Sequence, residues 1–194
     1  MYTNSAYWHQ SRVDFKDKKH SLFVGSCGTY RLYTIKKLPT HRPRGRVDYQ
    51  LLYIASGKAH FYFNGKEQVV SAGNMVLYRP KEEQRYYYYG AEHPEVYWVH
   101  FTGNNVKNIL RKYGIADDVH VICSGISMEY KQLYQNMIQE LQLKQEDYEE
   151  LLVNYLRQLF ILIHRQLLTK PRKKNPMIMD DMAQAVEYFR THYN

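Results

Sequence analysis

The chain has 194 residues, 44% of them hydrophobic and 15% aromatic, which is enough for a globular domain with its own core plus an appendage. Its formal net charge of +8 admits nucleic acid or another anionic surface as a partner. Four of the positive charges, however, crowd into one short stretch, Lys170, Arg172, Lys173 and Lys174, so we do not expect a DNA-reading patch on the body of the domain. No apolar run reaches the ~18 residues that span a bilayer.

Cysteine use and the N-terminal residues indicate a compartment. Cys27 and Cys123 match no metal-ligand spacing and form no disulfide framework, so reduced thiols are expected. The first twenty residues lack the apolar core of a signal peptide. We therefore expect a cytoplasmic protein.

Residues 1–20 are polar and charged, with scattered aromatic residues and no clear period. This composition predicts an extended N-terminal arm. It does not predict a packed element.

The residue pattern over residues 21–125 predicts a β domain. Short runs rich in β-branched and aromatic residues are separated by turn signals at Ser56-Gly57, Asn64-Gly65 and Gly73-Asn74. Asn64-Gly65 is the strongest of these signals, because both residues tolerate the positive φ of a two-residue hairpin loop. Many short strands at this spacing predict a sandwich or a small barrel.

Residues 126–169 change to a helical period and predict two helices. The first recurs at steps of three and four with Ser127 as its N-cap, and its apolar positions are Tyr130, Leu133, Tyr134, Met137, Ile138 and Leu141. The second begins near Asp147, after an acidic run that suits a helix N-terminus.

The second helix has more apolar residues than one buried face needs. We expect it to pack on the barrel and on the same helix of a second copy, with a dimer interface at Leu152, Tyr155, Leu156, Leu159 and Ile163. In the alternative, the helix over residues 128–143 covers the second face within one chain.

A basic, proline-containing linker is expected over residues 170–176, and an amphipathic helix begins in residues 177–194. A lone helix beyond a linker has nothing of its own to bury against, which suggests the truncated start of a larger domain.

The order of these segments resembles the N-terminal domain of AraC-type transcription regulators. The stretches that carry the resemblance are HRPRGRVDYQLLYIASGKAHFYFNGKE, VSAGNMVLYRPKEEQRYYYYG, EVYWVHFTG and MAQAVEYFRTHYN. The resemblance implies a mainly β, cupin-like barrel (a double-stranded β-helix or jelly roll), two dimerising helices, and the first helix of a helix-turn-helix domain. It also implies a homodimer that senses a small effector, often a sugar, and contacts DNA only through the domain missing here, with no membrane partner.

The same resemblance implies ligand-binding residues. Arg42 and Tyr86 fall on sugar-contacting positions, and Trp98 falls on a tryptophan that stacks against the sugar ring. Val96 departs from the pattern, because a pocket histidine is expected there. Strand alternation adds His100, on the face of Trp98, and Tyr88, on the face of Tyr86, as secondary candidates. An aromatic face and a few fixed donors and acceptors are what sugar recognition requires.

Two other functions remain open at this point. A metal-dependent cupin enzyme would need two histidines one residue apart on a strand, a nearby carboxylate and a later histidine, and the nine histidines here are dispersed. We therefore expect no catalytic residues, no metal and no cofactor. A ligand-free dimerisation module is the second alternative, and small-molecule stabilisation of the barrel would count against it.

Overall fold

The computed structural model describes residues 1–9 and 14–169. Its strands are β1 Tyr2–Tyr7, β2 Phe23–Arg31, β3 Lys37–Arg42, β4 Tyr49–Ser56, β5 Lys58–Phe63, β6 Lys66–Ser71, β7 Asn74–Tyr78, β8 Gln84–Tyr89, β9 Glu95–Thr102 and β10 Val121–Cys123. Its helices are α1 Val106–Lys112, α2 Met128–Leu143 and α3 Tyr148–Leu168, with a short 3-10 turn at Gly90–Glu92. The predicted linker at 170–176 and the helix expected in 177–194 lie outside the described residues.

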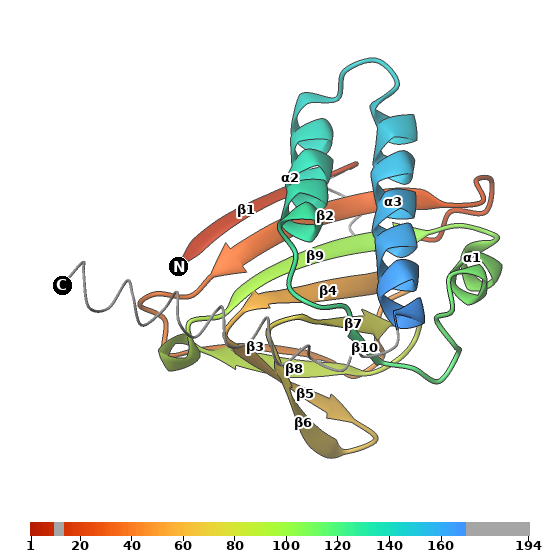
Figure 1. The fold of residues 1–194 in the computed structure, drawn as a ribbon. Helices are drawn as coiled ribbons and strands as arrows, with labels where there is room; N and C mark the ends of the chain where they lie inside the picture. The colour runs from red at the N-terminus through yellow and green to blue at the C-terminus, as the bar shows by residue number, and fades with distance from the viewer. Residues whose placement is uncertain (10–13, 170–194) are drawn as a thin grey trace, which may run out of the picture.

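Two antiparallel sheets face each other and form the barrel (Figure 1). The larger has the order β1-β2-β9-β4-β7-β10, and the smaller has the order β3-β8-β5-β6. This arrangement, followed by α2 and α3, confirms the predicted fold class of a cupin-like barrel with two helices after it. The short helix α1 and strand β10 were not predicted.

Strand β4 is buried on both of its faces, which explains its uninterrupted apolar run. Leu52 and Ile54 point into the core between the two sheets, and Leu51 and Tyr53 point into the core beneath the helices. All four side chains have no exposed surface. A strand covered on both sides loses the alternation of polar and apolar residues that a half-exposed strand shows.

The Asn64-Gly65 turn joins β5 to β6, as predicted. Both residues have positive φ, 52° and 75°, which is the backbone that a tight hairpin with the twist of its strands requires. Gly57 and Gly73 also have positive φ, at the other two predicted turns.

Helices α2 and α3 form an antiparallel pair on the outer face of the larger sheet, over β1, β2 and β9 (Figure 1). The Ser127 side chain caps α2 by accepting a hydrogen bond from the backbone of Glu129. The six apolar residues predicted for this helix are its buried residues. None of the helices in the described part of the chain is both long and apolar enough to span a bilayer.

The N-terminal segment differs from the prediction, because part of it is a packed strand. Tyr2–Tyr7 pairs antiparallel with β2 along its length, from Tyr2 opposite Arg31 to Tyr7 opposite Ser26. The segment continues the larger sheet at its edge and becomes one wall of a cavity described below. This strand forms by backbone pairing with β2, which is distant in the sequence, and no local sequence period predicts that pairing.

The predicted dimer interface also needs correction. Leu152, Leu156, Leu159 and Ile163 are each at most 1% exposed, because they form the face of α3 that packs on the sheet and on α2. Side chains enclosed within one chain cannot meet a second copy. Tyr155, the fifth predicted residue, is half-buried at the margin of this core.

Candidate ligand-binding site

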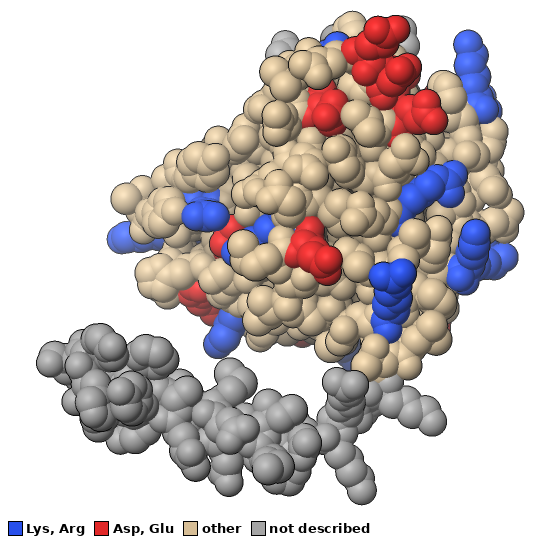
Figure 2. Space-filling view, turned by 45° about the horizontal axis from the view of Figure 1, so that its top comes forward, with Lys and Arg blue, Asp and Glu red and all other residues tan. Residues whose placement is uncertain are grey.

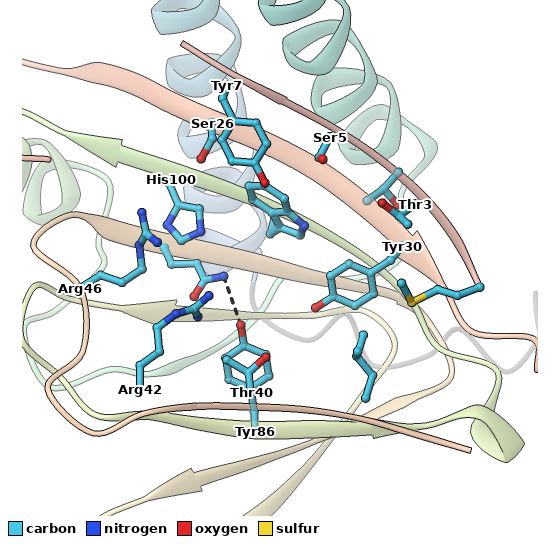
Figure 3. Close-up of a pocket in the computed structure, with 15 residues that line it drawn as sticks. Thr3, Ser5, Tyr7, Ser26, Tyr30, Thr40, Arg42, Arg46, Tyr86 and His100 are labelled. Carbon is cyan, nitrogen blue, oxygen red and sulfur yellow. Dashed lines mark hydrogen bonds between the residues drawn. The ribbon is translucent and has the colours of Figure 1, made fainter. Parts of the chain in front are cut away.

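A cavity of about 390 Å³ lies between the two sheets, with β1 along one side (Figure 3). It is lined by Met1, Thr3, Ser5, Tyr7, Ser26, Thr29, Tyr30, Leu38, Thr40, Arg42, Arg46, Gln50, Tyr86, Trp98 and His100. Its volume falls in the range of about 300–1,000 Å³ that is usual for small-molecule sites.

Strand alternation supplies most of this lining. Trp98 and His100 point into the cavity from β9, and Thr3, Ser5 and Tyr7 do the same from β1. Successive side chains of a strand point to opposite faces, so every second residue reaches the cavity.

The aromatic wall centres on Trp98. Its indole ring lies 6.2 Å from the ring of Tyr7 and 5.2 Å from that of His100, measured between ring centroids. Trp98 is only partly buried, whereas most of its neighbours on β9 are fully buried. A large aromatic face is therefore presented to the cavity and is available to the C–H surface of a ligand.

Basic and polar side chains gather at one end of the cavity, where Arg42, Arg46 and His100 approach one another (Figure 3). Arg42 Nη1 donates to Gln84 Oε1 at 2.9 Å. Arg46 donates to both carboxylate oxygens of Asp48, from Nε at 2.7 Å and from Nη2 at 2.8 Å. Asp48 lies behind this wall and does not line the cavity.

Burial and the Asp48 cluster set the charges at this end. Burial raises the pKa of Asp48, but the close approach of His100 and the two hydrogen bonds from Arg46 outweigh it and leave the pKa below its ordinary value. Burial lowers the pKa of His100, whose Nδ1 lies 3.4 Å from Asp48 Oδ1. At neutral pH, Asp48 is therefore ionised and His100 is neutral.

Four of the five predicted ligand residues, Arg42, Tyr86, Trp98 and His100, line this one cavity. Tyr88 does not. It has no exposed surface, and its hydroxyl accepts a hydrogen bond of 2.7 Å from Tyr30. The ring of Tyr30 packs edge-on against it and takes the place at the cavity wall. Tyr88 is thus a core residue that positions a lining residue.

Several lining residues were missed by the sequence analysis. Thr3, Ser5 and Tyr7 alternate along β1 in a run too short and too polar to read as a strand. Gln50 could have been identified from the sequence, because it is a lone amide at the start of the apolar run YQLLYIA. Arg46 lies in the loop between β3 and β4, where the sequence does not indicate which way a side chain points.

Within residues 1–9 and 14–169, no three His, Cys, Asp or Glu side chains are grouped so that they could hold a metal ion. The cavity offers hydroxyls, one amide, two guanidinium groups, an imidazole and an aromatic wall. These groups can bind and orient a small polar molecule by hydrogen bonding and stacking.

Comparison with known families decides the assignment. The model of the AraC-like ligand binding domain matches residues 26–182. The chain belongs to this family. Membership confirms the resemblance seen in the sequence, and it makes this AraC-like chain a ligand-binding domain.

The search of curated proteins found no match to this chain. Among solved structures it is similar to apo ToxT of Vibrio cholerae strain SCE256, with 17% identity and a TM-score of 0.45 over 76% of this chain and 55% of that one. Wild-type ToxT bound to unsaturated fatty acid gives 15% identity and a TM-score of 0.43 over 76% and 54% of the two chains. The EutQ protein of Clostridium difficile gives 11% identity and a TM-score of 0.31 over 41% of this chain and 57% of that one. The AraC-like domain thus spans about half the length of the ToxT chains that it matches.

Proposed function

We propose that this AraC-like domain is the effector sensor of a cytoplasmic, dimeric transcription regulator, and that its effector is a sugar or a related polyhydroxylated metabolite that controls carbohydrate-utilisation genes. The observation that carries the proposal is the pairing, in one cavity, of the Trp98 face with polar groups from both sheets. Sugar rings present an apolar C–H face and a rim of hydroxyls, so a site for them needs both features.

Arg42, Tyr86, Trp98 and His100 are the proposed ligand contacts. They come from three strands, β3, β8 and β9, of two different sheets. A ligand that touches all four therefore ties the sheets together and stabilises the barrel as a whole.

Thermal unfolding in the presence of a sugar panel tests the proposal. A ligand at about 100 times its dissociation constant stabilises the folded state by roughly 2.7 kcal/mol. Trp98→Ala should abolish the shift produced by any ligand found, and Trp8→Phe, at the tryptophan outside the lining, should leave it intact. A panel that stabilises nothing would contradict the proposal and favour the ligand-free dimerisation module. A shift that survives Trp98→Ala would contradict the assignment of the ligand to the Trp98 cavity.

The dimer is proposed through the exposed face of α3. Leu151, Asn154, Gln158, Ile161, Arg165 and Leu168 are all exposed and recur at alternating steps of three and four. This is the spacing at which two helices interlock their side chains. A two-fold contact through α3 would place two DNA-binding domains side by side for two half-sites.

DNA binding itself is proposed to reside outside the described residues. On the face in Figure 2, Lys and Arg side chains are scattered singly, without forming one basic patch. Phosphate binding draws its strength from several cations acting together. A gel-shift assay should therefore find only weak, salt-sensitive binding by residues 1–194, and sequence-specific binding that resists salt would contradict this.

A further inference from the structure

The lining of the cavity has an unbalanced positive charge. Apart from tyrosines, its ionisable side chains at the polar end are two arginines and a histidine, Arg42, Arg46 and His100, and none of the fifteen lining residues is an Asp or Glu. Burial lowers the pKa of His100, and although the neighbouring Asp48 carboxylate acts to raise it, the positive charges of Arg46 and Arg42 help to leave it below the ordinary value. The histidine therefore stays neutral beside two guanidinium groups.

The two arginines differ in how their charges are compensated. Arg46 forms a two-pronged, buried pair with Asp48, which neutralises it. Arg42 donates to an uncharged amide, that of Gln84. Among the residues that the structure describes, no carboxylate lies within salt-bridge distance of Arg42. The positive charge of the Arg42 side chain is therefore left for a ligand in this partly enclosed cavity.

Gln50 supplies a second, independent observation. Gln50 as a residue is 3% exposed, and it lines the same end of the cavity, where its Nε2 donates to the Tyr86 hydroxyl at 3.4 Å. Its Oε1 is buried and has no hydrogen-bond partner within the described structure. A buried acceptor without a donor is unfavourable, so this oxygen is suited to a ligand hydroxyl.

Building on the proposed function, we infer that the effector is an acidic monosaccharide: its single carboxylate or phosphate group binds Arg42, a neighbouring hydroxyl donates to Gln50 Oε1, and its ring lies against Trp98. Hydrogen bonds between a guanidinium and an anionic oxygen are about twice as strong as neutral ones. A neutral sugar would leave the charge of Arg42 without an anionic partner in the cavity. A fatty acid would leave Gln50 unpaired.

Trp98 can report binding directly. The only other tryptophan, Trp8, packs against Phe23 and donates to Glu149, away from the cavity lining. In a Trp8→Phe background, indole fluorescence excited beyond the tyrosine band comes from Trp98 alone. The probes are glucuronate and galacturonate, their neutral parents glucose and galactose, glucose 6-phosphate, and an unsaturated fatty acid.

The expected result is that a uronate or the sugar phosphate shifts Trp98 fluorescence with an affinity at least about tenfold above that of its neutral parent, corresponding to about 1.4 kcal/mol. Which of the two acids binds identifies the anionic group. Added salt should reduce this preference, because it screens the ionic contact.

Two variants test the assignment to Arg42 and Gln50. Arg42→Gln should remove the preference for the acid, while Arg85→Gln, at an exposed arginine of β8 stacked on the Tyr62 ring, should keep it. Gln50→Glu should also remove the preference, because it places a carboxylate beside Arg42 without changing the size of the side chain.

The outcomes separate this inference from the proposed function. Equal binding of neutral and acidic sugars, or a preference that survives Arg42→Gln, would overturn the inference and leave sugar sensing in place. Binding of the fatty acid alone, or no fluorescence response to any probe, would overturn both.

Discussion

Trp98 lies directly against the backbone of Gly28, its partner in the β2–β9 pairing: a Cβ atom added at residue 28 would sit 2.5 Å from Cζ2 of the indole ring. The glycine does not serve a turn here. It leaves the space that lets the indole ring lie flat along the sheet and present its face to the cavity.

Gly28→Ala should therefore displace the Trp98 ring. We expect a stability loss of about 1–3 kcal/mol from overpacking and an affinity loss of at least about tenfold for any cavity ligand. Calorimetric unfolding and ligand titration measure the two effects. Gly25→Ala, on the same strand, would meet the edge of the Phe15 ring at 3.2 Å and the His100 carbonyl oxygen at 3.8 Å, without a clash as close as that at residue 28, and serves as the control. Affinity unchanged in Gly28→Ala would show that the position of Trp98 does not matter to the ligand.

Two turn glycines should respond very differently to alanine. Gly57 and Gly65 have similar positive φ, 69° and 75°, which costs any other L-residue about 1–2 kcal/mol. A Cβ at Gly65 has nothing within 4 Å, whereas one at Gly57 would collide with the carbonyl oxygen of Glu92. Gly65→Ala should thus reduce the free energy of unfolding only by the backbone cost, and Gly57→Ala should reduce it several times more. Equal urea midpoints for the two variants would refute this reading of the Gly57 contact.

Acid should destabilise the domain through Asp48 and its neighbours Arg46 and His100. The folded state holds His100 neutral, so as the pH falls through about 6.5 only the unfolded chain gains this proton, and the free energy of unfolding decreases. The pKa of Asp48 is lowered on folding, so its contribution is present above the unfolded value of about 3.9 and is lost as the pH falls through its folded pKa.

Urea unfolding of the wild type and of His100→Gln at about pH 7.5 and about pH 5.5 measures the contribution of His100. His100→Gln should flatten the loss between these two values while leaving the loss at lower pH. A variant that loses as much stability as the wild type over this interval would show that His100 is not the group that titrates.

The two faces of α3 should separate stability from assembly. Leu159 has no exposed surface and Ile161 is 36% exposed. Leu159→Asp buries an unpaired charge and should destabilise the single chain by more than about 4 kcal/mol. Ile161→Asp should keep the thermal midpoint of the chain but lower the dimer content measured by equilibrium ultracentrifugation. Ile161→Asp that leaves a dimer intact would exclude the exposed face of α3 as the interface.

The sequence predicted the elements whose cause is local. The Asn64-Gly65 hairpin depends on two residues that accept positive φ, and the start of α2 depends on a hydroxyl at Ser127. The shared face of Trp98 and His100 follows from the two-residue period of a strand. None of these features needs a distant partner, so each can be read from a few neighbouring letters.

The same rules failed where a distant segment decides the outcome. Tyr86 and Tyr88 share a face of β8, yet Tyr30 from β2 covers Tyr88 and leaves Tyr86 at the cavity. In α3, both Leu159 and Ile161 belong to runs with steps of three and four, and only the sheet beneath the helix determines which run is buried.

The sequence by itself thus determined the barrel with two helices, because periods, turns and caps are properties of the local backbone. The family and the ligand residues Arg42, Tyr86 and Trp98 came from the resemblance to AraC-type regulators, and strand alternation added His100. Only the tertiary structure decided that Thr3, Ser5 and Tyr7 form a wall of the cavity and that Arg42 keeps an uncompensated charge there. Pairing of β1 with β2, and pairing of Asp48 with Arg46 in preference to Arg42, are choices among alternative partners. Such choices depend on distances that exist only once the chain has folded.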